Sequence, residues 1–439
     1  MTAVNLEGVG FKQTEIGCIP SDWHVVSLGS VASKITDGTH DTPKQMKEGI
    51  PFLTAIHVKE NRIDFDSCYF VSEEVHKEIF RRCNPESGDI LMVNIGAGTA
   101  TTAVVNVPYE FSLKNVALIK PDINNNGRYI NYALQFTRNK TLESLATGGA
   151  QPFLSLSQIA RLIIARPTKL EQTAIANALS DVDALIQELE KLIAKKQAIK
   201  TATMQQLLTG RTRLPQFAHH PDGRKKGYKP SELGEIPEDW EVKTLNQIAA
   251  IRSGGTPSTS NNKYWDGDIN WCTPTDITSL KGRKYLSSTA RKITALGVAE
   301  SAAEILPIGT VVMTSRATIG ECAITAEKMS TNQGFKSFIC NSDTDNEFVY
   351  YLLSILKDRF IELCSGSTFL EISTTQVRGV SVATPAKTEQ REIAIILSDM
   401  DQELQTLKQR LNKTRQIKQG MMHELLTGKT RLVKPAGAA

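Results

Sequence analysis

The segment HDTP at residues 40–43 comes nearest to a catalytic pair, because His40 and Asp41 adjoin in it. Such a pair activates a nucleophile only with a third group beside it, and none is indicated. The sequence has no NPPY- or DPPY-like methyltransferase loop, since NPES (84–87) is no substitute, and no GxxxxGK[ST] phosphate loop. SGGTPSTSNNK (253–263) lacks the phosphate-loop order, and acidic pairs of the nuclease kind occur only at background frequency. The sequence therefore favours a binding protein without catalytic residues over an enzyme.

Metal and cofactor sites are not indicated either. The seven cysteines are scattered and form no CxxC pair, and His219 and His220 have no cluster of carboxylate or cysteine ligands beside them. We therefore expect no metal, no bound cofactor and no disulfide framework, with a reducing cytoplasm as the location.

The composition is that of an ordinary globular protein, with 40% hydrophobic and 22% charged residues. No apolar run approaches the roughly 20 residues of a membrane helix, and the N-terminal residues have no apolar signal-peptide core. A net charge of +4 permits nucleic-acid binding if the basic residues cluster.

The chain is an internal repeat. Residues 171–214 align without a gap with residues 389–432, and both copies contain EQ, LSD.D and LLTG.TRL. GFKQTEIGCIPSDW (10–23) and GYKPSELGEIPEDW (227–240) are identical at eight of fourteen positions. The middles between these blocks, about 24–165 and 241–383, match only in scattered places with drifting spacing. They are expected to be two versions of one domain with different surfaces on a common framework.

Each repeat ends in a long predicted helix. Apolar residues recur at alternating steps of four and three, which is the heptad spacing of a coiled coil. The helices follow Pro167 and Pro385 and stop before Gly210 and Gly428. We expect the two stripes to pair in an antiparallel coiled coil, and packing of each stripe on a sheet is the alternative. The predicted seam consists of Ile175, Leu179, Val182, Ile186, Leu189, Ile193, Ile393, Leu397, Met400, Leu404, Leu407 and Leu411.

The predicted fold class is α/β (α+β), with a mixed sheet and helices in each of two tandem domains that two long helices separate. The predicted boundaries are a first domain (1–166), a first helix and its exit (167–214), an exposed basic linker (215–230), a second domain (231–384), a second helix (385–432) and a tail (433–439).

The duplicated plan resembles the specificity subunit of type I restriction-modification enzymes over nearly the full chain. It rests on an IP..W opening, a variable domain and an EQ…LLTG..RL helix, all repeated, with ITDGTHDTP (35–43), SGGTPSTSNNKYW (253–265) and TSRATIG (314–320) in the middles. The resemblance implies two target-recognition domains that each read half of an asymmetric, bipartite site in double-stranded DNA. It implies two methyltransferase subunits and restriction (motor-nuclease, or translocase) subunits as partners, and S-adenosylmethionine, ATP and Mg are expected on those partners only.

The first middle offers three groups of candidate DNA-reading residues. Base edges are read by short polar side chains, Arg and Lys on loops or helix ends. The alternative is that the glycines and prolines merely shape turns. The candidates are Thr39, His40, Thr42 and Lys44, then Asn94 and Thr99 in a glycine-rich loop, and Gln151.

The second middle offers a larger set, of which Arg316 is the sharpest because arginine is the commonest specific reader of guanine. A salt bridge to a local acid is the alternative for Arg316. NIGAGTA (94–100) stands where the second middle has SRATIG (315–320), so Arg316 has no basic counterpart in the first. The candidates are Thr256, Ser258, Lys263, Tyr264, Ser315, Arg316, Thr318, Lys336 and Thr368.

The repeated polar residues of the helices are candidates for holding the methyltransferase, with ordinary helix solvation as the alternative. They are Glu171, Gln172, Asp181 and Asp183 with their copies. The tryptophans at 23, 240, 265 and 271 are expected in cores. Two rival functions stay open: a duplicated coiled-coil scaffold that binds protein partners without specific DNA binding, and an enzyme with an unrecognised site in the middles.

Overall fold

The computed structural model describes residues 10–96, 98–145, 153–364 and 370–434. The chain divides into two compact units. Unit 1 comprises residues 1–190 and 409–439, and unit 2 comprises residues 191–408. Both long helices, α4 (Lys169–Leu208) and α11 (Lys387–Leu426), contribute one end to each unit. The predicted combination of helices and mixed sheets is confirmed.

The body of unit 1 is built on a four-stranded antiparallel sheet with the order β10-β9-β12-β4. A three-stranded sheet, β11-β5-β8, adjoins it. The elements are β1 (Phe11–Thr14), β2 (Gly17–Pro20), β3 (His24–Ser27), β4 (Ala32–Asp37), β5 (Ile50–Thr54), β6 (Val58–Lys59), β7 (Arg62–Ile63), β8 (Tyr69–Val71), α1 (Glu73–Arg82), β9 (Ile90–Val93), β10 (Thr102–Val104), β11 (Ser112–Lys114), β12 (Val116–Pro121), α2 (Gly127–Leu145), α3 (Leu156–Arg161) and β13 (Ile163–Arg166).

Unit 2 repeats this plan with a five-stranded sheet, β17-β24-β21-β22-β19, and a three-stranded sheet, β20-β18-β23. Its elements are β14 (Tyr228–Ser231), β15 (Gly234–Pro237), β16 (Glu241–Thr244), α5 (Leu245–Ile248), β17 (Ala249–Ser253), β18 (Trp265–Cys272), α6 (Pro274–Ser279), β19 (Tyr285–Leu286), β20 (Arg291–Ile293), α7 (Ala295–Ala299), β21 (Val311–Thr314), β22 (Cys322–Thr325), β23 (Met329–Thr331), β24 (Phe335–Cys340), α8 (Asn346–Ile355), α9 (Lys357–Leu363), α10 (Thr374–Arg378) and β25 (Ser381–Thr384).

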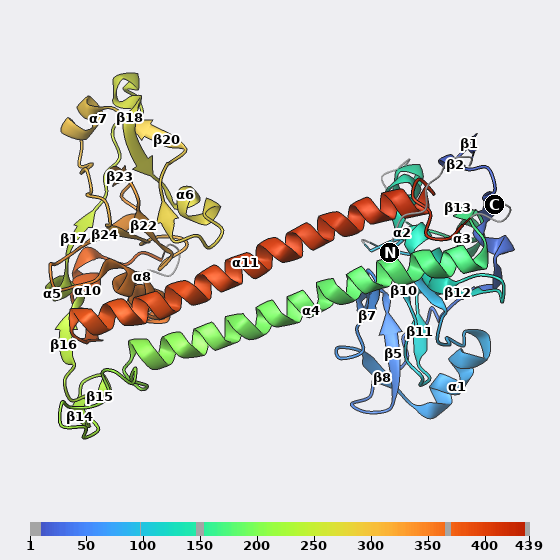
Figure 1. Cartoon of the computed structure of the whole chain (residues 1–439), viewed down its shortest axis with the longest axis horizontal. Helices are drawn as coiled ribbons and strands as arrows, with labels where there is room; N and C mark the ends of the chain where they lie inside the picture. The colour runs from blue at the N-terminus through green and yellow to red at the C-terminus, as the bar shows by residue number, and fades with distance from the viewer. Residues whose placement is uncertain (1–9, 97, 146–152, 365–369, 435–439) are drawn as a thin grey trace. The chain divides into compact units, whose positions relative to one another are not determined.

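The two long helices run antiparallel within each unit, as Figure 1 shows for α4 in green and α11 in red. In unit 1, Lys418 Nζ lies 2.7 Å from Asp183 Oδ1 and Arg415 Nη2 lies 2.6 Å from Glu190 Oε1. In unit 2, Lys196 Nζ lies 2.7 Å from Glu403 Oε1, and Lys200 pairs with Asp401. In both sets the α11 number falls as the α4 number rises, which confirms the predicted antiparallel pairing.

The predicted apolar stripe is buried or half-buried at all twelve positions, but it is not a pure helix–helix seam. Ile175 and Leu179 belong to the main hydrophobic core of unit 1, and Ile393 and Leu397 belong to that of unit 2. The first turns of each helix therefore pack on the body of their own unit. The alternative of packing on a domain is correct for these four residues.

The repeated phrase LLTG.TRL completes the core of the opposite repeat. Leu425 and Leu426 of the second copy lie in the core of unit 1, and Leu207 and Leu208 of the first copy lie in that of unit 2. Gly428 (φ +68°) ends α11, and a Cβ there would approach Pro20 Cγ to 2.3 Å, so only glycine fits. Gly210 occupies the equivalent position against Pro237.

Each exit phrase then places an arginine beside a buried glutamate, a buried tryptophan and an exposed aspartate, in a cluster that we call a clasp. The unit 1 clasp is Arg431 with Asp22, Trp23 and Glu171. Arg431 Nη2 donates to Glu171 Oε2 (2.7 Å) and Asp22 Oδ2 (2.9 Å), and Trp23 Nε1 donates to Glu171 Oε2 (3.1 Å). The repeat thus joins residues from opposite ends of the sequence in one cluster.

The unit 2 clasp is Arg213 with Asp239, Trp240 and Glu389. Arg213 Nε donates to Glu389 Oε1 (2.7 Å) and Nη1 donates to Asp239 Oδ1 (2.7 Å), while Trp240 Nε1 donates to Glu389 Oε2 (3.2 Å). Burial alone would raise the pKa of Asp239, but hydrogen bonds from Arg213 and Lys226 outweigh it and lower that pKa to about 2.

Unit 2 should therefore lose stability as the pH falls from about 4 to about 2. The pKa of Asp239 is lower in the folded unit than in the unfolded chain, so its contribution is present above the unfolded value and is lost as the carboxylate is protonated. Urea unfolding of the full chain at several pH values, followed by hydrogen exchange of β16 and β25, measures this loss. Asp239→Asn should show a shallower decline than the parent protein, and parallel declines would contradict the assignment.

Candidate nucleic-acid interface

The strand order brings the predicted loops of unit 1 to one end of its main sheet. Strand β12 lies between β9 and β4, with Val116 opposite Val93 and Ala117 opposite Asp37. The loops that follow β4 and β9 and the turn that precedes β12 therefore meet there. We call this end, with residues 38–44, 94–96, 98–99 and 112–115, the loop edge of unit 1.

The loop after β4 is pinned to the β11–β12 turn by its backbone. Thr39 N–H donates to Leu113 O (2.9 Å), and Asn115 N–H donates to Thr39 O (3.1 Å). A Cβ on Gly38 would lie 2.0 Å from Leu113 O, so the approach requires glycine. The loop is therefore held in a defined conformation on the sheet.

His40 is paired differently from the dyad that the sequence suggested. Its Nε2 lies 3.2 Å from Asp37 Oδ2, and its Nδ1 lies 2.8 Å from Asn115 Oδ1, whereas the Asp41 amide donates to Thr39 Oγ1. Asp37 is buried and also pairs with Arg82. Both ring nitrogens of His40 are thus engaged in holding the loop, and the imidazole remains largely exposed.

The other candidates of unit 1 fall into three groups. Thr42, which accepts a hydrogen bond from Lys114, and Lys44 are exposed. Asn94 and Thr99 are buried, so the prediction of base contact is corrected for them: Thr99 Oγ1 donates to Gly96 O (2.7 Å) and shapes the loop. Gln151 lies outside the described residues.

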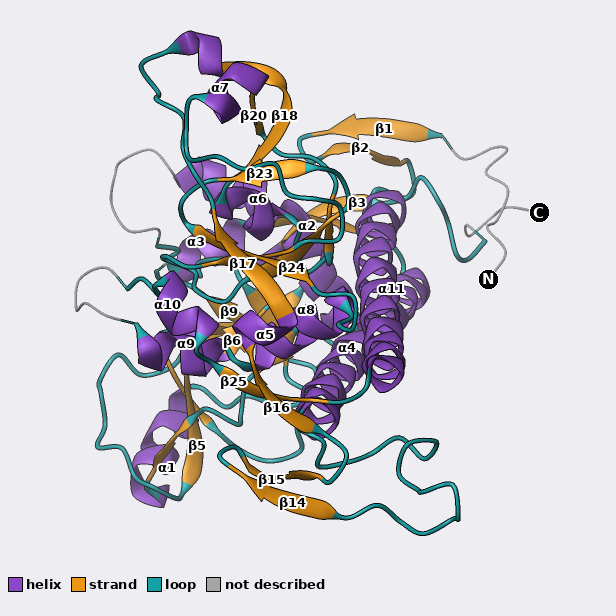
Figure 2. Cartoon of the chain, turned by 90° about the vertical axis from the view of Figure 1, so that its left-hand side faces the viewer, coloured by secondary structure: helices purple, strands orange, loops and turns teal. Residues whose placement is uncertain are grey.

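Unit 2 has the equivalent loop edge where β17 and β21 end and β24 begins, which Figure 2 shows with β17 beside β24. It comprises residues 254–257, 315–320 and 332–334, with Lys336 just inside β24. Ser315 N–H donates to Gly334 O (2.7 Å), and Lys336 Nζ donates to Ser253 Oγ (3.3 Å). The strands thus bring together candidates that are separate in the sequence.

Arg316 is exposed at this edge and forms an ion pair with Glu371, with Nε 2.9 Å from Oε1. The side chains retain relative exposures of 45% and 41%, so the guanidinium remains accessible to a ligand. The predicted alternative, a salt bridge to a local acid, is therefore present. Arg316 also lies on an exposed surface, as the predicted DNA-reading role requires.

Lys336 and Ser315 are buried, which corrects the prediction that they contact bases directly. Burial lowers the pKa of the Lys336 ammonium, and the neighbouring Arg316 charge acts in the same direction while Glu371 opposes it. The charged form of Lys336 is therefore less favoured beneath the edge than it would be in water.

The remaining candidates of unit 2 are divided between two places. Thr256, which donates to Gln333 Oε1, and Thr318 are exposed at the loop edge. Ser258, Lys263 and Tyr264 lie with the three-stranded sheet, where Ser258 O accepts from Trp265 Nε1 (3.0 Å) and Lys263 O accepts from Thr294 Oγ1 (2.8 Å). Thr368 lies outside the described residues.

Sequence reasoning missed the residues that organise both edges, among them Asp37, Arg82, Asn115, Ser253 and Glu371. Each acquires its role through a partner that lies far away in the sequence, so no local pattern marks it. The expectation for the tryptophans holds at Trp23, Trp240 and Trp271, which are buried. Trp265 is half-buried, with the Arg291 guanidinium 3.9 Å from its ring centroid.

The framework candidates for holding a methyltransferase are mostly internal. Glu171 and Gln172 are buried, the first in the clasp and the second accepting the Asn126 amide (2.9 Å). Asp183 accepts from Tyr132 Oη (2.6 Å) and pairs with Lys418. The prediction of partner contact is corrected for these three residues, and Asp181 remains exposed.

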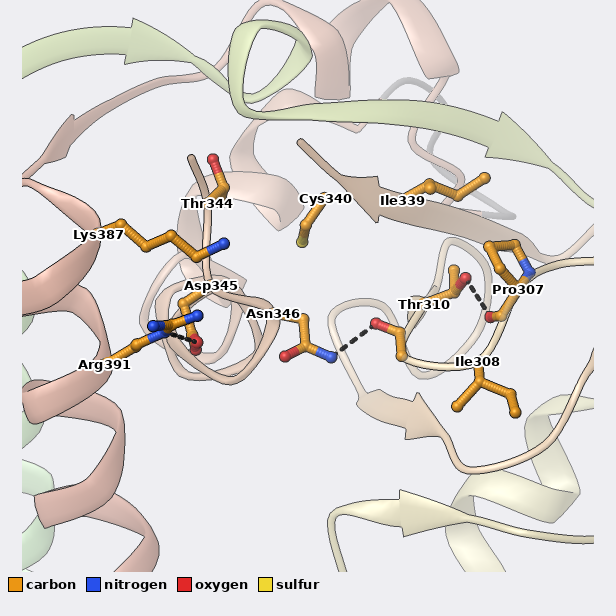
Figure 3. Close-up of a pocket in the computed structure, with 11 residues that line it drawn as sticks. Pro307, Ile308, Thr310, Ile339, Cys340, Thr344, Asp345, Asn346, Lys387 and Arg391 are labelled. Atoms are coloured by element: carbon orange, nitrogen blue, oxygen red, sulfur yellow. Dashed lines mark hydrogen bonds and ion pairs between the residues drawn. The ribbon is translucent and has the colours of Figure 1, made fainter. Parts of the chain in front are cut away.

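A polar cleft of about 290 Å³ lies at the start of α11 in unit 2, and Figure 3 shows the residues that line it. It lies at the opposite end of β21 and β24 from the loop edge. Arg391 faces Asp345 across 3.8 Å, and Asn346 Nδ2 donates to Gly309 O (2.9 Å). Lys387 Nζ donates to Ser342 O. Both cationic side chains of the cleft, Arg391 and Lys387, therefore already have partners within unit 2. The cleft lies where the start of α11 meets the start of α8.

Among the residues that the structure describes, no cluster of three or more metal-ligating side chains occurs. None of the helices found there is sufficiently long and apolar to cross a membrane.

Two similar domains, whose loop edges differ in chemistry and whose cores are each completed by a helix end from the other repeat, define an internally duplicated protein. The sequence profile of the type I restriction modification DNA specificity domain matches residues 20–201 and 237–416. The chain therefore belongs to the type I restriction-modification specificity-subunit family and has two recognition domains.

Relatives agree with this assignment. The chain is 28% identical over 433 residues to the putative type I restriction enzyme MjaX specificity subunit of Methanocaldococcus jannaschii, with 96% of this chain and 97% of that protein covered. It is 37% identical over 183 residues to the MjaIX specificity subunit of the same organism, of which it spans 42%, while 41% of this chain is aligned.

The fold agrees with a crystal structure of the type I restriction-modification S subunit from M. genitalium, with a TM-score of 0.58, 16% identity and coverage of 97% of this chain and 99% of that one. A chain from a structural study of complex assembly and conformational transition in a type I restriction-modification system gives a TM-score of 0.54, 15% identity and coverage of 93% and 98%.

Proposed function

We propose that this chain is the DNA-reading subunit of a type I restriction-modification complex. Each recognition domain reads one half of an asymmetric, bipartite site in double-stranded DNA through its loop edge, and the paired helices set the spacer. The observation that carries the proposal is that equivalent strands in both units present loop edges of different chemistry on a repeated framework. An asymmetric DNA site requires two domains of the same fold whose DNA-contacting loops differ.

The chain itself is proposed to be non-catalytic. His40 is the candidate for acid–base chemistry that the sequence raised. Both of its ring nitrogens contact side chains of the loop edge, Nε2 that of Asp37 and Nδ1 that of Asn115. Two methyltransferase subunits supply S-adenosylmethionine chemistry, and restriction subunits supply ATP and Mg chemistry, in the cytoplasm. Two copies of one methyltransferase suit a chain whose framework is present twice.

The test is the methylation pattern of genomic DNA in cells with and without this chain, in the presence of its methyltransferase. One discrete bipartite sequence should be methylated only when the chain is present. Purified complex should protect the same sequence, with affinity that falls steeply with salt because phosphate contacts release counterions. A complex that assembles but protects no discrete sequence would favour the scaffold hypothesis.

Arg316→Ala should relax selectivity in one half-site only. The exposed guanidinium at the loop edge of unit 2 is expected to read a base edge, and such contacts discriminate by about 1–3 kcal/mol, or roughly 5- to 150-fold. Methylation rates on sites altered singly in each half measure the effect. Arg224→Ala, which removes an exposed linker arginine paired with Asp222, is the matched control. An equal loss on every sequence would assign Arg316 to a phosphate or structural role.

A further inference from the structure

The loop edges differ most sharply at one pair of equivalent residues. In unit 2, Arg316 forms an isolated antiparallel bridge with Glu371, and in unit 1 Ile95 forms the same bridge with Phe153. A charged pair in one recognition domain is therefore replaced by an apolar pair in the other.

The backbone frames around these pairs match in detail. Leu154 N–H donates to Asn94 O (2.8 Å), and Ile372 N–H donates to Ser315 O (3.1 Å). The next residues, Ser155 and Ser373, cap α3 and α10 with the same capping box. The equivalence of the two pairs thus follows from hydrogen bonds and helix caps.

Both members of the apolar pair are exposed at the loop edge. Phe153 is 50% exposed and Ile95 is 39% exposed, although Ile95 follows the buried Asn94 and Phe153 precedes the buried Leu154. Single exposed hydrophobic residues are common, but a bridged aliphatic–aromatic pair at the edge of a polar surface is the kind of feature that marks a contact site. His40 and Thr42 lie at the same end of the sheet, so the pair has polar neighbours on this edge.

We infer that Ile95 and Phe153 contact the C5-methyl group of thymine in the half-site that the first recognition domain reads. Thymine is the only base that presents a methyl group in the major groove, and apolar side chains recognise it by contact. The equivalent Arg316–Glu371 pair offers charged groups to the other half-site. The inference rests on the proposed DNA-reading function and names what one of its two edges reads.

The test uses the full complex with its methyltransferase and DNA duplexes in which each thymine of the first half-site is replaced, one at a time, by deoxyuridine. This change removes the methyl group and keeps the base pair. At one position or more, binding should weaken about fourfold, as expected for the loss of one buried methyl group. The double variant Ile95→Ala, Phe153→Ala should bind thymine and deoxyuridine duplexes equally at that position.

Ile123→Ala is the matched control, because Ile123 is an exposed isoleucine of unit 1 that lies away from the loop edge. It should keep the thymine preference. If parent complex binds its site with no thymine preference, or if the double variant keeps the full preference, the inference is overturned while the proposed function stands. A complex that binds no discrete site would instead overturn the proposed function.

Discussion

Replacing Arg431 with alanine is expected to lower the free energy of unfolding of unit 1 by about 3–5 kcal/mol. Arg431 is 1% exposed, and its guanidinium is shared between the carboxylates of Glu171 and Asp22. Glu171 is equally buried. Truncation of the arginine therefore leaves a buried carboxylate whose only other side-chain donor in the clasp is Trp23 Nε1. An unpaired buried charge costs far more than the pair itself contributes.

Urea unfolding of the full chain, with hydrogen exchange of β3 and β13 as the local measurement, isolates the effect on unit 1. Arg415→Ala, on α11 within unit 1, is the control, since its ion pair with Glu190 is about half exposed on both sides. That change should cost less than about 1 kcal/mol. Equal small losses in the two variants would show that the clasp is not a stabilising element.

The framework could be predicted in large part from the sequence because its signals are local. The heptad stripe, the bounding prolines and the glycines after LLT indicate two long helices of the observed extent. The sequence also shows that the segment LLTG.TRL occurs at the end of both helices. It does not show that Arg213 and Arg431 are buried, because their carboxylate partners lie in the opposite repeat and arginine is ordinarily a surface residue.

The positions of the loops that form the two loop edges could be predicted from the sequence. Which of their side chains are exposed could not. Glycine-rich composition after a strand indicates a loop, yet it does not say which polar residues turn inward. Asn94, Thr99, Ser315 and Lys336 turned out to be buried. The apolar Ile95–Phe153 pair has no local sequence signal, because its two residues are far apart in the chain, and the bridge pattern reveals its equivalence to Arg316–Glu371.

A fragment that ends at Leu214 is expected to form a homodimer. Unit 1 needs a helix end that brings Leu425, Leu426 and Arg431 to its core and clasp. Residues Leu207, Leu208 and Arg213 are the ungapped equivalents of these three residues. A second copy of the fragment therefore supplies these core and clasp groups in place of the missing α11, and it supplies Lys200 in place of Lys418 against Asp183.

Light scattering or sedimentation of the fragment measures this directly. The same fragment with Arg213→Ala should shift strongly toward monomer, because Glu171 then has no cation to join it in either copy. Lys225 and its neighbours lie beyond the fragment, so linker charge cannot account for the association. A stable, folded monomer would show that unit 1 does not depend on a swapped helix end. With the methyltransferase present, the dimer should direct methylation to a palindrome of two first half-sites, because two identical loop edges read identical sequences.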